Sequence, residues 1–133
     1  MIVAVADTHV LLWNLSNDPK LSRRAAAFLD EVGQQRSQIA VSSISLIEMV
    51  YLIEKGRITS ESLTRTINML NDTEGIFMEI PVDQRIARAL ARVDAAQIPD
   101  MPDRIVAATA LHLNVPIISR DGRIRLSTLE TIW

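Results

Sequence analysis

Residues 2–7 read IVAVAD, a short apolar run that ends at a single carboxylate, Asp7. A run of this kind is typical of a strand that is buried on both faces, as in a parallel sheet. Carboxylates avoid apolar surroundings unless they are paired or bind a metal, so Asp7 is a candidate site residue. The alternative is that Asp7 caps a following helix, a role that aspartate fills well. The two roles are compatible.

Apolar runs of strand length and segments of helical periodicity alternate along the chain. Besides residues 2–6, we expect strands over residues 38–42, 76–80 and 116–119, and a short fifth strand could form at 128–133. We expect helices over residues 22–32, 43–55, 60–71 and 102–113, and one that begins after Asp83. In this order a single helix, bounded by Ser22 and Gly33, joins the first two strands.

The order of these elements predicts an α/β fold, because strands that are separated by helices cannot pair as hairpins. We expect three layers, with a mostly parallel central sheet of four to five strands and helices on both faces. The 133 residues fit one domain, 1–133, and no repeat or linker divides the chain. In open parallel sheets, binding sites form beyond the carboxyl ends of the strands.

Composition excludes several classes of function. The sequence has 48% apolar and 23% charged residues, which is usual for a globular protein, and no apolar run is long enough to cross a membrane. The opening MIVAVADTHV has no features of a signal peptide, so we expect a cytoplasmic protein. The absence of cysteine excludes disulfides, thiolate nucleophiles and cysteine-based metal sites. The net charge of -2 neither favours nor excludes a nucleic-acid partner.

Glu48 lies on the apolar stripe of its predicted helix. Its neighbours one turn away are Ile44, Tyr51 and Leu52, which we expect to face the core. An unpaired buried carboxylate costs several kcal/mol, so Glu48 requires a cation, a hydrogen-bond network or a raised pKa. The alternative is a buried ion pair with an arginine or a capping contact.

Asp103 and Asp121 occupy comparable places. Asp103 begins a helix face that continues through Val106 and Ala110, although an acid in the first turn also complements the helix dipole. Asp121 follows the apolar run 115–119, although Asp-Gly is also an ordinary turn signal. These separate structural roles do not predict that two strand ends and two inward helix faces carry carboxylates at one sheet edge. We therefore interpret the four acids as one site.

Four converging carboxylates would repel one another unless divalent cations compensate their charge. Mg2+ or Mn2+ is the expected ion, because hard cations prefer carboxylate oxygen and Mg2+ keeps several waters. The remaining positions are then open to a phosphate group and an attacking water. The acids therefore indicate hydrolytic chemistry.

Four ordered motifs resemble those of the PIN-domain ribonucleases, and within them the VapC-type toxins of prokaryotic toxin–antitoxin systems. They are DTHVLLW at 7–13, SSISLIE at 42–48, PDRIVAATA at 102–110 and PIISRDGRI at 116–124. The resemblance spans nearly the whole chain, and its specificity lies in the ordered set. By this resemblance the family's acidic quartet corresponds to Asp7, Glu48, Asp103 and Asp121, and Ser119 matches a position usually held by Ser or Thr.

Asp100 resembles an extra acid of some family members, although DMPDR at 100–104 departs from their DPxDR pattern. The resemblance implies an endoribonuclease that leaves 5′-phosphate and 3′-hydroxyl ends, with a water activated by Mg2+ or Mn2+ that the quartet holds. We expect Asp7 and Asp103 to bind the metal directly, and Glu48 and Asp121 to bind it directly or through water.

The resemblance also implies partners: a homodimer and a cognate antitoxin protein whose tail covers the acidic pocket. The sequence adds that residues 44–53 and 63–70 carry more apolar surface than one small core needs, which suits an interface.

Residues next to the acids are candidates for contacts with RNA. Ser119, Arg104 and Arg120, together with Arg123, could meet substrate phosphates, and the alternative for each arginine is a surface salt bridge. We do not expect His9 to act as a general base.

Trp13 and Trp133 could stack on bases, but packing in the core or in an interface is the favoured interpretation. Two other classes of protein stay open. A phosphate-accepting receiver domain also carries acids at strand ends, but it needs a late lysine, whereas Lys20 and Lys55 are early. A PIN-like metal-binding or interaction module without turnover would keep the same acids.

Overall fold

A computed structural model describes residues 1–133, and its five strands form one sheet. The strands are β1 Ile2–Ala6, β2 Gln38–Ser42, β3 Phe77–Ile80, β4 Ile117–Ile118 and β5 Thr131–Ile132. Their spatial order is β3-β2-β1-β4-β5, and every neighbouring pair is parallel. This confirms the parallel sheet that the alternation of strands and helices predicts. The short fifth strand is real, although it covers only two residues of the predicted stretch.

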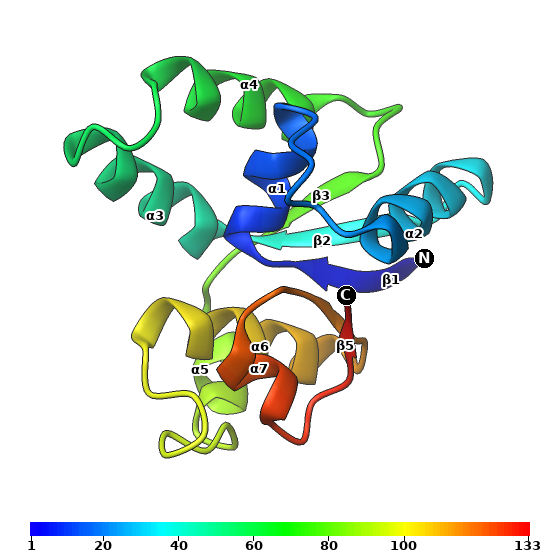
Figure 1. Ribbon diagram of the computed structural model, residues 1–133. Coiled ribbons are helices and arrows are strands. Elements are labelled where there is room, and N and C mark those ends of the chain that lie inside the picture. Colours follow the sequence, from blue (N-terminus) through cyan, green and yellow to red (C-terminus); the bar gives the residue numbers. More distant parts are fainter.

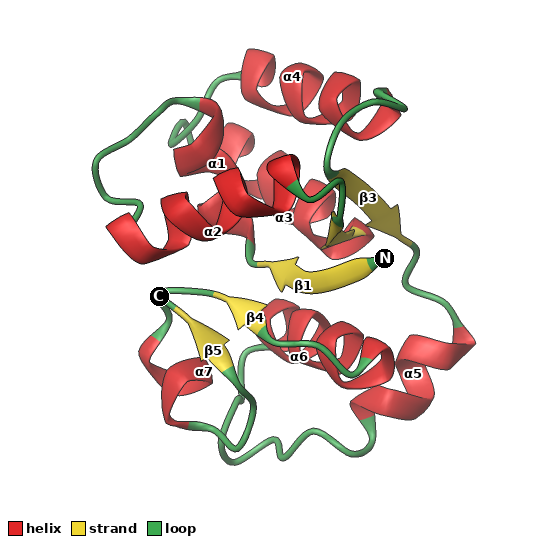
Figure 2. Ribbon diagram, turned by 90° about the vertical axis from the view of Figure 1, so that its right-hand side faces the viewer, coloured by secondary structure: helices red, strands yellow, loops and turns green.

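Helices cover both faces of this sheet. They are α1 Thr8–Leu15, α2 Arg23–Gln34, α3 Ser43–Glu54, α4 Ser60–Asn71, α5 Gln84–Leu90, α6 Met101–Leu113 and α7 Gly122–Leu126. The first four lie on one side and the last three on the other (Figures 1 and 2). The predicted three-layer α/β fold is therefore confirmed, and none of the helices has the length and apolar character that crossing a membrane requires.

The central strand β1 divides the core into two halves. Ala4 and Ala6 point into a cluster beneath α1 and α2, whereas Val5 points into a cluster with α5 and α6. All three side chains are fully buried. This alternation follows from the pleat of a strand and explains why residues 2–6 are apolar without interruption. A strand covered on both faces holds the residue at its end in a fixed position.

Four details differ from the sequence-based expectation. Two helices, not one, join β1 and β2, because Asn17 takes a left-handed conformation (φ 55°) and Pro19 follows it. The second of them, α2, continues through Gly33, and its chain reversal comes at Arg36 (φ 56°). The predicted turn at Asp121 is the start of a five-residue helix, α7.

The fourth difference is which face of α3 is buried. Its fully buried side chains are Ser45 and Met49, one turn apart, which turns Tyr51 to the opposite side. Tyr51 is 62% exposed, so the expectation that it faces the core was wrong. Glu48 is nevertheless half-buried, because it lies at the border between the two faces.

Candidate active site

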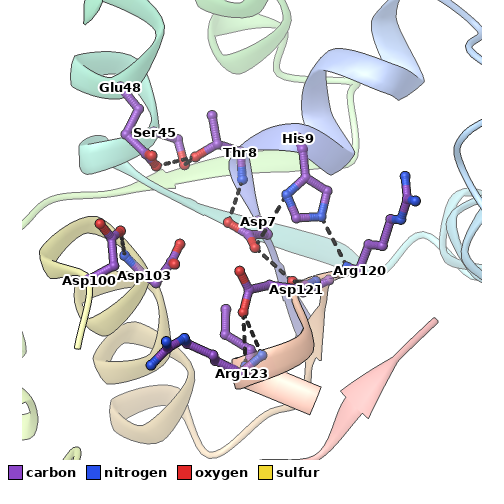
Figure 3. A network of polar contacts seen from close by, with 12 residues as sticks. Asp7, Thr8, His9, Ser45, Glu48, Asp100, Asp103, Arg120, Asp121 and Arg123 are labelled. Carbon is purple, nitrogen blue, oxygen red and sulfur yellow. Dashed lines mark hydrogen bonds and ion pairs between the residues drawn. The ribbon is translucent and has the colours of Figure 1, made fainter. Parts of the chain in front are cut away.

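Asp7 lies at the carboxyl end of β1 and is the N-cap of α1, so the capping role expected from sequence is confirmed. Its side chain is almost fully buried, with 3% of the residue exposed. The backbone N–H of Thr8 donates to Asp7 Oδ1 at 2.8 Å, and the Ser119 hydroxyl donates to Asp7 Oδ2 at 2.7 Å (Figure 3). Because each oxygen has its own donor, the carboxylate has one orientation.

Ser119 lies directly after β4, the neighbour of β1 in the sheet, and is fully buried. Its hydroxyl oxygen accepts a hydrogen bond from the backbone N–H of Asp121 at 3.0 Å while its proton goes to Asp7. The side chain therefore ties the turn that carries Asp121 to the end of β1. In this structure the Ser119 hydroxyl donates its one proton to Asp7, so it has no proton left for a phosphate.

Glu48 reaches the same region from α3. Thr8 donates its hydroxyl to Glu48 Oε1 at 2.6 Å, and the Thr8 oxygen is 2.8 Å from the hydroxyl of Ser45. Burial raises the pKa of Glu48, the Thr8 hydrogen bond lowers it, and the charges of Asp7 and Asp100 raise it further. Sequence reasoning missed Thr8 and Ser45, although Ser45 precedes Glu48 by one helical turn and Thr8 adjoins Asp7.

Asp103 projects from the first turn of α6 toward the other acids (Figure 3). Burial raises the pKa of Asp103 to about 8, assisted by the negative charges of Asp7, Asp121, Asp100 and Glu48. No hydrogen bond reaches its carboxylate. The carboxylate of Asp100 caps the same helix by accepting the backbone N–H of Asp103 at 3.3 Å.

Asp121 follows Ser119 and is the N-cap of α7. Its Oδ1 accepts hydrogen bonds from the backbone N–H groups of Arg123 and Ile124 at 2.9 and 3.0 Å. The four predicted acids thus come together at the carboxyl edge of the sheet, from the ends of β1 and β4 and from α3 and α6.

A family model for the PIN domain matches residues 4–126 of the chain. The protein belongs to the PIN-domain family. Solved structures agree in fold: a toxin–antitoxin complex from Klebsiella pneumoniae has 23% sequence identity and a TM-score of 0.69, with 98% of this chain and 96% of that chain covered. VapBC2 from Rickettsia felis, bound to a DNA fragment from its promoter, has 16% identity and a TM-score of 0.70, covering 98% and 97%.

FitAcB from Neisseria gonorrhoeae has 21% identity and a TM-score of 0.60, with 98% of this chain and 96% of that chain covered. No curated protein matches the sequence. The family match sets aside the receiver domain that the strand-end acids alone left open. At these identities, the likeness to solved structures establishes the fold of this PIN domain.

The carboxylates of the PIN domain have the chemistry of a site for a hard divalent cation. No arginine or lysine forms an ion pair with any of them: the one ion pair between charged side chains joins Arg85 to Asp83, and the ring of His9 lies 3.5 Å from Asp7 Oδ2. Burial is the main cause of the raised pKa of Asp103, and the negative charges of the other acids raise it further. Even so, no three acidic or histidine side chains are close enough together to form a ready-made metal site. The donor set fits the ion by its chemistry, because hard divalent cations prefer carboxylate oxygens.

His9 is held on both sides of its ring. Its Nε2 accepts the backbone N–H of Arg120 at 3.0 Å, which leaves the ring proton of the neutral form on Nδ1, 3.5 Å from Asp7 Oδ2. Burial lowers the pKa of His9 more than the nearby charges of Asp7 and Asp121 raise it. With one nitrogen engaged by the backbone, the ring is a bridge between Asp7 and residue 120.

The arginines next to the acids differ in what they contact. The guanidinium of Arg104 donates to the backbone oxygens of Leu90 and Val93 at 3.1 and 3.2 Å, at the end of α5. Arg104 therefore joins α6 to the end of α5, and its contact with RNA stays a prediction. Arg120 and Arg123 are exposed, and the Arg120 guanidinium lies 5.7 Å from the centre of the Trp13 ring.

Proposed function

We propose that this PIN domain is a Mg2+- or Mn2+-dependent endoribonuclease and the toxin of a toxin–antitoxin pair. PIN domains are typically metal-dependent nucleases. The observation that carries the proposal is the group of four acids at one sheet edge, without a paired cation, in which Asp103 has a pKa of about 8. A cluster of this kind is unfavourable in itself, so a bound cation is its natural complement.

In this proposal Asp7 and Asp103 bind the cation directly, and Glu48 and Asp121 bind it directly or through water. Bound there, the cation supplies Lewis-acid polarisation of a phosphoryl oxygen and a water of lowered pKa. The protein supplies orientation. Asp7 is fixed by its two hydrogen bonds, and Thr8 sets the direction of Glu48.

Asp103 has a different task, because its carboxyl is protonated at neutral pH when no cation is present. It must release this proton to become a ligand. Cation binding is thus coupled to proton release, so the affinity for the cation rises with pH up to about the pKa of Asp103 in the cation-free protein.

We further propose a single domain over 1–133 that forms a homodimer and binds a cognate antitoxin. The similar structures from Klebsiella pneumoniae and Rickettsia felis are complexes of this class, which supports the pairing. Exposed apolar side chains on α3 and α4 offer an interface, namely those of Ile47, Val50, Tyr51 and Ile67. Light scattering at micromolar concentrations tests the dimer, and a monomeric mass would argue against it.

One observation favours a second candidate, a PIN-like module that binds metal or a partner without turnover. The acids do not form a ready-made metal site in this structure, so the precise arrangement that turnover requires is not preformed. The module would bind Mn2+ with no cleavage of any RNA.

The deciding experiment is cleavage of a mixed panel of structured RNAs in Mg2+ or Mn2+, with EDTA as the reference. Asp7→Asn and Asp103→Asn are compared with Asp30→Asn, the same change at an exposed position of α2. The nuclease proposal expects cation-dependent cutting that both site variants lose and Asp30→Asn keeps. Equal cutting by all variants points to a contaminant, and Mn2+ binding without cutting selects the module.

A further inference from the structure

Both tryptophans of the chain lie in one cluster beside the acidic site. Trp13 comes from α1, and Trp133 follows β5. Their ring centres are 5.8 Å apart, and the ring of His9 lies 4.9 Å from Trp13 and 6.3 Å from Trp133. The three rings are tilted against one another rather than stacked face to face, which leaves faces that a further planar group can cover.

The cluster is only partly covered by the protein. Trp13, Trp133 and His9 are each partly exposed, although the chain has few aromatic residues with which to build its core. An open cavity of about 350 Å³ lies against the cluster, lined by His9, Trp13, Arg120 and Asp121. The same cavity therefore has an aromatic wall, a cation and one carboxylate of the proposed catalytic quartet.

Hydrogen bonds fix the positions of the aromatic residues relative to the acids. The Arg120 N–H donates to His9 Nε2, and the Ser119 N–H donates to the Ile132 backbone oxygen at 3.2 Å, which places Trp133 beside β4. Ser119 in turn donates to Asp7. A group that binds against the rings is thus held at a set position relative to the carboxylates.

We propose that His9, Trp13, Trp133 and Arg120 form a stacking subsite for one unpaired nucleobase of the RNA whose backbone lies at the acids. This inference rests on the proposed function. Aromatic rings and the planar guanidinium of arginine are the groups on which proteins stack bases of single-stranded RNA. Arg120 is exposed above the Trp13 ring, so it can cover a base from one side and also meet an adjacent phosphate.

The carboxylate of Asp121 in the cavity wall argues for a base as the occupant of the cavity itself. A phosphate in direct contact with Asp121 would be repelled, whereas an uncharged base is not, and its amino groups can donate to the carboxylate. The subsite is expected to prefer unpaired segments, because a base in a duplex is already stacked on its neighbours.

Tryptophan fluorescence, excited at a wavelength that Tyr51 does not absorb, tests this directly, because Trp13 and Trp133 are the two tryptophans of the chain. The probe is a single-stranded RNA hexamer of mixed sequence, titrated in EDTA so that no strand is cut. The control is a hexamer with the same sugar–phosphate backbone and no bases. We expect saturable quenching by the base-bearing strand and binding about 5- to 100-fold weaker for the abasic one. Equal effects of the two strands, or no quenching, would overturn the subsite.

Variants assign the binding to individual residues. Arg120→Gln and Trp13→Ala should weaken binding of a labelled hexamer, measured by anisotropy, by about 5- to 100-fold, while Trp13→Phe keeps most of it. Arg88→Gln is the matched control, since Arg88 is an exposed arginine of α5 far along the chain from the cluster. Circular dichroism checks the fold of Trp13→Ala, and the exposed Arg120 provides the test if that variant unfolds.

The outcomes separate this inference from the proposed function. Base-selective quenching without cleavage in Mg2+ or Mn2+ supports the subsite and counts against the nuclease. Cleavage without base-selective quenching supports the nuclease and overturns the subsite. A change in emission with protein concentration alone, and none with RNA, would identify the cluster as a protein interface and overturn the subsite.

Discussion

The two sides of the acidic site are built differently. On the side of β1 and α3, Asp7 and Glu48 accept hydrogen bonds from Ser119 and Thr8, side chains that are themselves buried. On the side of α6, the carboxylate of Asp103 accepts none, and burial raises its pKa to about 8. The first side is organised by hydrogen bonds without any ligand, whereas in the proposed function the second is complete only when a cation replaces the proton of Asp103. In the proposed site, Asp7 and Glu48 are therefore held in place by hydrogen bonds, whereas the protonation of Asp103 depends on the ligand.

The largest expected effect comes from removing a proposed ligand on either side. Asp7→Asn and Asp103→Asn should each lower the rate of RNA cleavage about a thousandfold, since cation-derived stabilisation is worth several kcal/mol. The measurement is the single-turnover rate in Mg2+, with Asp30→Asn as control. If Asp103→Asn alone kept its activity, the α6 side would have no part in the site.

Removing the hydrogen bond that positions Glu48 should have the next largest effect. Thr8→Val removes the donor to Glu48 and leaves Ser45 without its partner, so we expect a loss of about 10- to 100-fold in activity or Mn2+ affinity. Thr8→Ser keeps the hydroxyl and should restore most of the loss. Titration calorimetry with Mn2+ measures the affinity, and a variant that matches the wild type would show that Glu48 needs no positioning.

On the α6 side the expected change is one of stability with pH. Folded Asp103 holds its proton up to about pH 8, whereas its ordinary pKa is 3.8. Between these values the folded state binds more protons than the unfolded state, so the stability of the cation-free protein falls as pH rises. Asp103→Asn should flatten this slope and, after allowance for solvent screening, stabilise the protein by about 1 to 2 kcal/mol at pH 8.

Thermal unfolding from pH 5 to 8.5 measures this slope, with and without Mg2+. Added Mg2+ should raise the melting temperature of the wild type most at the higher pH, where the charged carboxylate is available. An Asp103→Asn variant with the slope of the wild type would contradict the assignment of that proton.

The smallest expected effect concerns Arg104. Arg104→Gln loses hydrogen bonds to the end of α5, so the free energy of unfolding should fall by about 1 kcal/mol while cleavage of RNA below the melting temperature stays unchanged. Urea denaturation and the cleavage assay measure the two quantities. A clear loss of activity with unchanged stability would indicate that Arg104 contacts the RNA substrate.

Much of the fold and the identity of the acids could be predicted from residue patterns. The uninterrupted apolar run 2–6 requires cover on both faces, and the acids after it and after 115–119 follow from where parallel strands end. The boundaries of the helices were less predictable. Asn17 and Arg36 take left-handed conformations, which asparagine adopts occasionally and arginine rarely, so the break between α1 and α2 and the end of α2 were missed.

The sequence by itself determined that the sheet is parallel and which carboxylates gather at its edge, because strand burial and helix periodicity are local properties of the chain. Only the tertiary structure decided what each side chain near those acids does. Arg104 adjoins Asp103 in sequence yet points to α5, while Ser119 and Thr8 reach carboxylates 112 and 40 residues away. The direction of a side chain and the partner it meets depend on how distant elements pack, and no local pattern contains that information.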